Sequence, residues 1–253
     1  MAFDFIKNRP KKEYKNTFLQ NIFLSIHFDK IDRNNISSDF AEKWKNYIKT
    51  TFNDLDVSSS FWETPISISR DDGCLTIILS NGFIGAIVGA KDYRSFIDNI
   101  LPQLYKLKTF LKDVLNLDSI NSISVRKVNI WQFKSKDNIK IEPLDVRKKI
   151  FSNDLICKKS NGILDENEKK IPNMHKYEWF ENDIKVIART VFLRYSNKNT
   201  AFNQVLDTEA IYAKNNIAIE DLEEKSILLN NILYELYHWC INTQILKIME
   251  GDK

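Results

Sequence analysis

An arginine inside an apolar strand is the first feature of this sequence that could do chemistry. Arg126 lies in residues 123–133, a predicted strand of irregular apolar phase. A guanidinium carries five N–H donors, and inside a fold it needs a carboxylate or several carbonyl oxygens to satisfy them. It could therefore hold an anionic ligand through two parallel hydrogen bonds. The alternative, which we favour, is a structural ion pair with Asp207 or Glu209 on another predicted strand.

A second group of basic and aromatic side chains occurs towards the end of a later predicted strand. It comprises Arg189, Arg194, Tyr195 and Lys198. Such a group could contact phosphate and stack on nucleic-acid bases. Arginines at a strand end can equally pack their stems on the sheet while their charged ends reach solvent. We favour the second interpretation because the folded part of the chain carries no excess of positive charge.

The charge balance locates the small basic excess of the chain. The 253 residues hold 37 Lys+Arg and 34 Asp+Glu, a formal net charge of +3. Residues 1–16 contain five basic and two acidic side chains, so the rest of the chain is formally neutral. Nucleic-acid binders depend on a strongly basic surface. We expect nucleic-acid binding only through residues 1–16, a basic N-terminal arm that leads into the fold and that can be removed without unfolding it.

Motifs of metal, cofactor and nucleophile chemistry do not occur in this sequence. The histidines and cysteines are far apart and form no pair with metal-ligand spacing: His27, His175, His238, Cys74, Cys157 and Cys240. Gly82, Gly85 and Gly89 do not have phosphate-loop spacing and fall in a predicted hairpin. We therefore predict no metal site, no cofactor and no catalytic constellation, and we expect a protein that is not an enzyme.

The elements that position these residues follow the same order twice. In residues 17–118, a strand precedes a helix (38–53), a three-stranded meander and a long helix (92–117), which we expect to kink at Pro102. In residues 119–253, a strand precedes a short helix, three strands and a long helix over 219–249 that Gly251 can cap. Residues 154–173 are polar and lysine-rich, and we expect an exposed excursion there.

The sequence therefore predicts an α+β fold in which two tandem β-α-β-β-β-α units form a mainly antiparallel sheet packed against long helices. Its hydrophobic fraction of 43% and its low Gly and Pro content are those of a globular protein. We find no transmembrane segment and no signal peptide, so we expect a cytoplasmic protein without a membrane partner.

Five short segments resemble a sporadically distributed family of uncharacterised bacterial proteins of similar length. They are residues 16–28 (NTFLQNIFLSIHF), 92–96 (DYRSF), 124–129 (SVRKVN), 205–209 (VLDTE) and 236–239 (LYHW). The resemblance spans nearly the whole chain. It implies an α+β fold in a bacterial cytosol and no particular chemistry. Sporadic families of this kind often belong to accessory genes, such as phage-defence or toxin–immunity cassettes.

Three functions follow as hypotheses. The first is a non-enzymatic interaction protein that binds another protein, or a second copy of itself, through its sheet or the seam between its helices. The second is a sensor of a small anionic ligand or nucleotide that uses the strand arginines. The third is nucleic-acid binding through residues 1–16.

Overall fold

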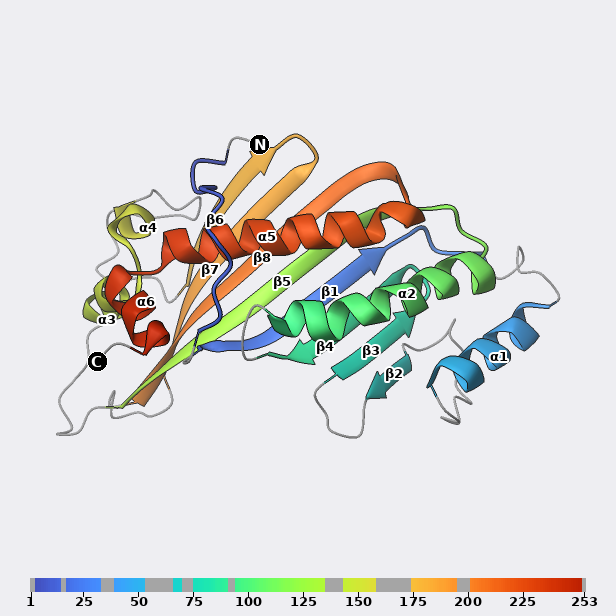
Figure 1. Cartoon of the computed structure of the whole chain (residues 1–253), viewed down its shortest axis with the longest axis horizontal. Helices are drawn as coiled ribbons and strands as arrows, with labels where there is room; N and C mark the ends of the chain where they lie inside the picture. The colour runs from blue at the N-terminus through green and yellow to red at the C-terminus, as the bar shows by residue number, and fades with distance from the viewer. Residues whose placement is uncertain are drawn as a thin grey trace.

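A single antiparallel sheet organises the part of the chain that the structure describes. The computed structural model describes residues 3–14, 17–32, 39–52, 66–69, 75–90, 94–134, 143–157, 174–194 and 201–251. Eight strands form the sheet in the order β2-β3-β4-β1-β5-β8-β7-β6, and every neighbouring pair is antiparallel (Figure 1). The α+β class predicted from the sequence is confirmed.

The strands and helices have the following bounds. The strands are β1 (Leu19–His27), β2 (Ile66–Ser69), β3 (Leu75–Ser80), β4 (Phe83–Gly89), β5 (Ser119–Lys134), β6 (Met174–Glu181), β7 (Ile184–Arg194) and β8 (Ala201–Ala218). The helices are α1 (Phe40–Phe52), α2 (Leu101–Thr109), α3 (Pro143–Ile150), α4 (Asn153–Cys157), α5 (Leu222–Cys240) and α6 (Thr243–Glu250). Two π-helical segments, η2 (Phe96–Ile100) and η3 (Phe110–Val114), flank α2, and a 3-10 turn, η4 (Ile219–Asp221), precedes α5.

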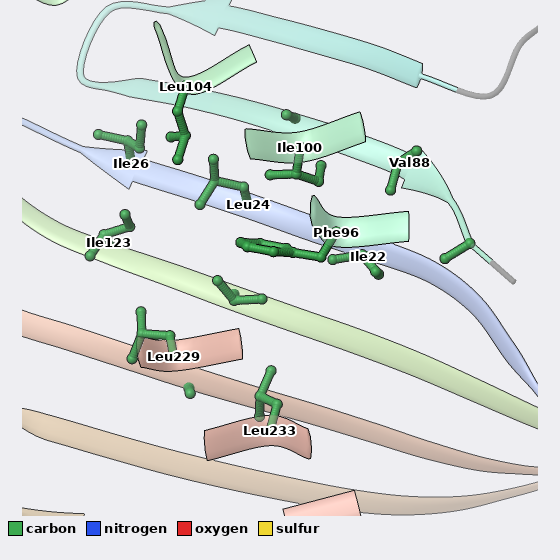
Figure 2. Packing of buried hydrophobic residues seen from close by; sticks show 14 of the residues in the cluster. Ile22, Leu24, Ile26, Val88, Phe96, Ile100, Leu104, Ile123, Leu229 and Leu233 are labelled. Carbon is green, nitrogen blue, oxygen red and sulfur yellow. The ribbon is translucent and has the colours of Figure 1, made fainter. Parts of the chain in front are cut away.

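The hydrophobic core lies between the sheet and the two helices α2 and α5, which cover the same face (Figure 1). Residues alternate along a strand between the two faces of a sheet. In β1 this alternation turns Ile22, Leu24 and Ile26 towards the helices, where they are buried. Figure 2 shows Phe96 of η2 beside Ile22 and Leu24, and Ile123 of β5 between β1 and Leu229 of α5. We call this side of the sheet the helix face.

The opposite side of the sheet, which we call the open face, carries side chains of partial exposure. In β1 these are Phe23 and Ser25, and the strand register extends the same face across the sheet. Alternation therefore assigns each polar strand residue to a face. Arg126 lies opposite Phe23 and belongs to the open face, whereas its neighbour Lys127 belongs to the helix face.

The N-terminal segment is part of the folded body and not an arm leading into it. Its described residues 3–14 cross α5 (Figure 1). Phe3 and Phe5 are buried, and Phe5 packs edge-on against Trp179 with 5.5 Å between ring centroids. Phe3 and Phe5 were the indication in the sequence that this segment is buried. The many charged residues of 1–16 suggested an exposed arm instead. Deleting the segment would remove these buried contacts, and the expectation that the body stays folded without it stays a prediction.

The helix predicted over 219–249 is interrupted, so the C-terminal end is not one long helix. α5 ends at Cys240, and Ile241 adopts an extended conformation that forms a bridge with Phe151. α6 is a new helix with Asn242 as its N-cap, because the side chain of Asn242 accepts a hydrogen bond from the N–H of Gln244. Gly251 ends α6 in the left-handed conformation with φ 92°, which confirms the predicted cap.

Two further predictions concern single segments. Residues 94–114 are helical without a break, and Pro102 lies in the interior of this stretch, directly after the π-helical segment η2. A π-helical turn is a place where the missing N–H of a proline can be accommodated, and the bend expected at Pro102 stays a prediction. The predicted excursion over 154–173 begins inside α4, where Leu155 is fully buried. Residues 158–173, which hold its lysines, lie outside the described residues.

Candidate functional site

The strand arginines singled out from the sequence form a network with two carboxylates on the open face. Nε and Nη2 of Arg126 donate to Oδ1 and Oδ2 of Asp207 at 2.7 and 2.9 Å. Nη1 of Arg189 donates to Oδ2 of Asp207 at 3.2 Å, and its Nη2 donates to Oε2 of Glu209 at 3.1 Å. Both arginines are thus held by carboxylates of β8.

The register of three strands explains why these four side chains meet. β8 lies between β5 and β7, so its carboxylates can be reached from both sides. Arg189 stands directly opposite Asp207, whereas Arg126 stands opposite Glu209 and reaches diagonally to Asp207. The side chain of Asp207 is only 9% exposed and that of Arg126 is 43% exposed. The carboxylate is therefore the buried centre of the network.

This geometry favours the structural ion pair over an anionic-ligand site at Arg126 and Arg189. The hydrogen bonds that Arg126 donates to Asp207 raise the pKa of Arg126, so the guanidinium stays charged. An incoming anion would have to displace a bidentate carboxylate that the fold already supplies. The other predicted members of this site, Tyr195, Lys198 and the side chain of Arg194, lie outside the described residues.

A cavity of about 50 Å³ lies on the helix face, between the sheet and α5. Its volume accommodates a few water-sized groups, since one water needs roughly 10–15 Å³ on this measure. Strands β1, β5 and β8 form its floor, α5 and α6 form its walls, and the segment before β1 contributes Tyr14 and Thr17. Its lining residues are Tyr14, Thr17, Leu19, Lys127, Asn129, Thr208, Leu233, Tyr234, Tyr237, His238 and Met249.

Lys127 is the charged side chain of this cavity. It occupies a helix-face position of β5 and is 6% exposed. Burial, together with the positive charge of Lys11, lowers the pKa of Lys127 to about 7. The ammonium and neutral amine forms are therefore both populated near neutral pH. The signal for this residue in the sequence is a lysine at an inward position of an alternating strand, and we did not single it out.

A tyrosine–histidine pair closes the cavity on the side of the N-terminal segment. Nδ1 of His238 lies 2.7 Å from the carbonyl oxygen of Tyr234, one helical turn earlier, so the ring donates from Nδ1. Nε2 then accepts a hydrogen bond from the hydroxyl of Tyr14. Burial lowers the pKa of His238, which keeps the ring neutral in this arrangement. The pair ties the N-terminal segment to α5.

Other basic residues of the N-terminal segment also contact acidic side chains. Arg9 forms an ion pair with Glu235 of α5 at 2.5 Å, and Lys12 forms one with Glu250 of α6 at 2.6 Å. These contacts hold the segment on the two C-terminal helices. They reduce the charge that residues 1–16 can offer to nucleic acid.

Exposed apolar side chains lie on the open face at both ends of the β6–β7 pair, with Met174 and Leu193 at one end and Phe180 beside the hairpin turn at the other. Three large apolar side chains of β6 and β7 are exposed: Phe180 by 66%, Met174 by 56% and Leu193 by 48%. The registers of β6 against β7 and of β7 against β8 place all three on the open face. We call these three residues the β6–β7 patch. Their signal in the sequence is a large apolar residue at an outward position of a strand, which alternation alone cannot distinguish from a core position.

Two further findings concern metal-ligand clusters and membrane-spanning helices. Among the residues that the structure describes, no three His, Cys, Asp or Glu side chains come together in a way that could hold a metal ion. Within the same ranges, no helix has both the length and the apolar character needed to span a membrane.

The chain was compared with protein-family models, with curated proteins and with solved structures. No protein-family model matches the chain, and no curated protein matches it. Among solved structures, a rolling circle replication initiator protein from Geobacillus stearothermophilus is similar at 15% sequence identity and a TM-score of 0.29. That match covers 88% of this chain and 86% of the other. At this TM-score the likeness does not establish a shared fold.

Proposed function

We propose that this chain is a non-enzymatic interaction protein that binds another protein chain through the open face of its sheet at β6 and β7. The observation that supports the proposal is the β6–β7 patch: of the five exposed large hydrophobic residues in the part of the chain that the structure describes, three lie on these two adjacent strands and on one face. Single exposed apolar residues are normal, but several on one face of two adjacent strands support an interaction surface.

The edge of the sheet beside the patch supports the same function. β6 is the last strand in the order of the sheet, and among the described elements it pairs with β7 alone. An edge strand presents backbone N–H and C=O groups to which a partner strand can add. A partner at this position would gain backbone hydrogen bonds from the edge and apolar contacts from the patch.

We infer as part of this proposal that the scaffold arose from two tandem units, residues 17–118 and 119–253. The strand order supports the inference, because it has the same pattern on either side of the β1–β5 contact. In each half the first strand lies innermost and pairs with the last strand, as β1 does with β4 and β5 with β8. Such a scaffold places β2 and β6 at equivalent outer edges.

The experiment compares the patch with an exposed apolar residue elsewhere. Affinity capture with the tagged full chain, from the cells that produce it, would use wild type, Phe180→Asp, Leu193→Asp and the control Tyr105→Asp. Tyr105 is 78% exposed on α2, away from β6 and β7. Binding of each captured protein would then be measured with purified components. We expect at least a tenfold loss of affinity for the two patch variants and none for the control.

The outcome that contradicts the proposal is equally definite. If the purified chain binds neither itself nor any captured protein, or if the patch variants bind as well as wild type, the β6–β7 patch is not an interaction surface. Circular dichroism of each variant establishes that a loss of binding does not come from unfolding.

A second candidate function is the binding of a small anionic ligand, and the cavity beside Lys127 favours it. We propose that such a ligand would bind at Lys127, the buried cation that lines this cavity. Formate, acetate and phosphate fit a cavity of about 50 Å³ better than a nucleotide does. A ligand at 100 times its dissociation constant adds about 2.7 kcal/mol to the free energy of unfolding. Thermal-shift measurements with these anions on wild type and Lys127→Met test it, and equal shifts in both proteins would refute it.

A further inference from the structure

The backbone geometry of the β6–β7 hairpin determines which residues of β6 face outwards. Glu181 pairs with Ile184 across the two-residue turn Asn182-Asp183, and Asn182 has a φ of 51°, as such tight turns require. The closing pair of a two-residue hairpin exchanges both backbone hydrogen bonds, and bonded and non-bonded pairs then alternate. The backbone groups that point away from β7 are therefore those of Met174, Lys176, Glu178 and Phe180.

The side chains of these four residues have a symmetric order. Lys176 and Glu178 directly flank Tyr177, and Met174 and Phe180 each lie three residues from it, one on either side. An antiparallel second copy of β6 with its two-fold axis at Tyr177 would place Lys176 opposite Glu178 of that copy. It would also place Met174 opposite Phe180. Each charge then faces its opposite, and each apolar side chain faces another.

The neighbouring two-fold registers lack this complementarity. An axis at Lys176 would place two copies of Lys176 opposite each other, and an axis at Glu178 would do the same with two carboxylates. Like charges directly opposite each other on adjacent strands are destabilising. In the latter register Lys176 would also face Phe180. The register centred on Tyr177 is therefore the one that the side chains favour.

The charges concerned are positioned on the open face, beside the edge. Nζ of Lys176 and Nζ of Lys185 each lie 2.8 Å from Oε1 of Glu178, and these hydrogen bonds lower the pKa of Glu178 to about 2. Glu178 is thus ionised, and Lys176, 41% exposed, can bridge carboxylates of both copies.

We propose that the partner of this chain is a second copy of itself, joined through antiparallel pairing of the two β6 edges about a two-fold axis at Tyr177. The inference rests on the proposed function, because it assigns a partner to the same surface. The two sheets become continuous in this dimer (Figure 1 shows β6 at the sheet edge). The axis is perpendicular to the sheet, so both helix faces lie on one side. On the other side, Met174 of each copy lies opposite Phe180 of the other.

Charge reversal of the full-length chain tests the pairing. In Lys176→Glu, two carboxylates of one copy face two of the other, and in Glu178→Lys four ammonium groups meet in the same way. We expect each variant alone to dimerise at least tenfold more weakly than wild type in sedimentation equilibrium. A mixture of the two variants restores every opposite-charge pair, so we expect a heterodimer of nearly wild-type affinity. Lys214→Glu, on an exposed part of β8, is the control and leaves dimerisation unchanged.

Introduced thiols test the register. In the double variant Met174→Cys and Phe180→Cys, the thiol at position 174 of one copy lies opposite the thiol at position 180 of the other. Backbone separations of bonded antiparallel pairs are about 5.5 Å, which suits a disulfide. We expect a covalent dimer after mild oxidation of the double variant and none from either single variant.

Three outcomes would overturn the inference. They are a wild-type chain that stays monomeric at millimolar concentration, a mixture of variants that does not recover, and an oxidised double variant that stays monomeric. The proposed function fails separately. A monomer that binds another purified protein through Phe180 and Leu193 keeps the interaction surface and removes only the second copy as its partner.

Discussion

Glu235 of α5 accepts hydrogen bonds from Arg9 through both the backbone and the side chain of that residue. The N–H of Arg9 lies 2.7 Å from Oε1, and Nη1 lies 2.5 Å from Oε2. The N–H of Lys7 also donates to Oε2, at 3.1 Å. One buried carboxylate on the C-terminal helix thereby holds the N-terminal segment, more than 220 residues away in the sequence.

Replacing Glu235 by Gln should loosen this segment. Burial by itself raises the pKa of Glu235. The hydrogen bonds from Lys7 and Arg9 and the charge of Arg9 together lower it by more, so the net shift of the pKa is downward. We expect the variant to lose about 2–3 kcal/mol of unfolding free energy, since one member of a buried pair is removed. Urea denaturation measures the loss, and hydrogen exchange should show faster exchange at Lys7 and Arg9. Glu223→Gln, on an exposed turn of α5, is the control; an equal loss in both variants would contradict the assignment.

The pH dependence of the same variant follows from the sign of the shift. A carboxylate whose folded-state pKa is depressed contributes stability above its unfolded value of 4.5 and loses it as the pH falls through the folded value. The difference between wild type and Glu235→Gln should therefore be constant above pH 6 and shrink below pH 4.5. A difference that grows on acidification would show that Glu235 is destabilised by burial.

Asp207→Asn should weaken the open-face network more than Glu209→Gln does. Asp207 accepts from both arginines, whereas Glu209 accepts from Arg189 alone. Because Arg126 is partly exposed, solvent screens the interaction, and we expect a loss of about 1–3 kcal/mol for Asp207→Asn. Glu209→Gln should cost less than 1 kcal/mol on the same grounds. Thermal and urea denaturation compare the two variants, and the reverse order would contradict the diagonal geometry.

Lys127→Met should change how stability depends on pH. The folded-state pKa of about 7 lies below the ordinary value of 10.5, so the unfolded chain binds more protons between these values. Wild-type stability should therefore rise with pH in this range, by at most about 1.4 kcal/mol per unit for one group. The variant lacks that slope. Urea denaturation at pH 7, 8 and 9 measures it, and parallel pH profiles for the two proteins would contradict a depressed pKa.

Much of the architecture could be predicted from local patterns. Alternating apolar residues in 17–28 and the Asn81-Gly82 turn correctly predicted β1 and the β3–β4 hairpin, in which Gly82 has a φ of 88°. The break at Ile241 could not be predicted, because the apolar spacing of a helix continues through it. Its extended conformation depends on the bridge to Phe151, a contact between segments far apart in the chain.

The candidate site was likewise predictable from the sequence only in part. The sequence placed Arg126 in an apolar strand and named Asp207 and Glu209, on another predicted strand, as its alternative ion-pair partners, whereas Lys127 was not singled out. Only the tertiary structure decided that Arg126 bonds the diagonal Asp207, across 81 residues of sequence, and that Lys127 borders a cavity under α5. Alternation between faces depends on adjacent peptide units, so any short segment reveals it. The choice of partner depends on strand register and on how a helix packs over the sheet, which the whole chain sets together.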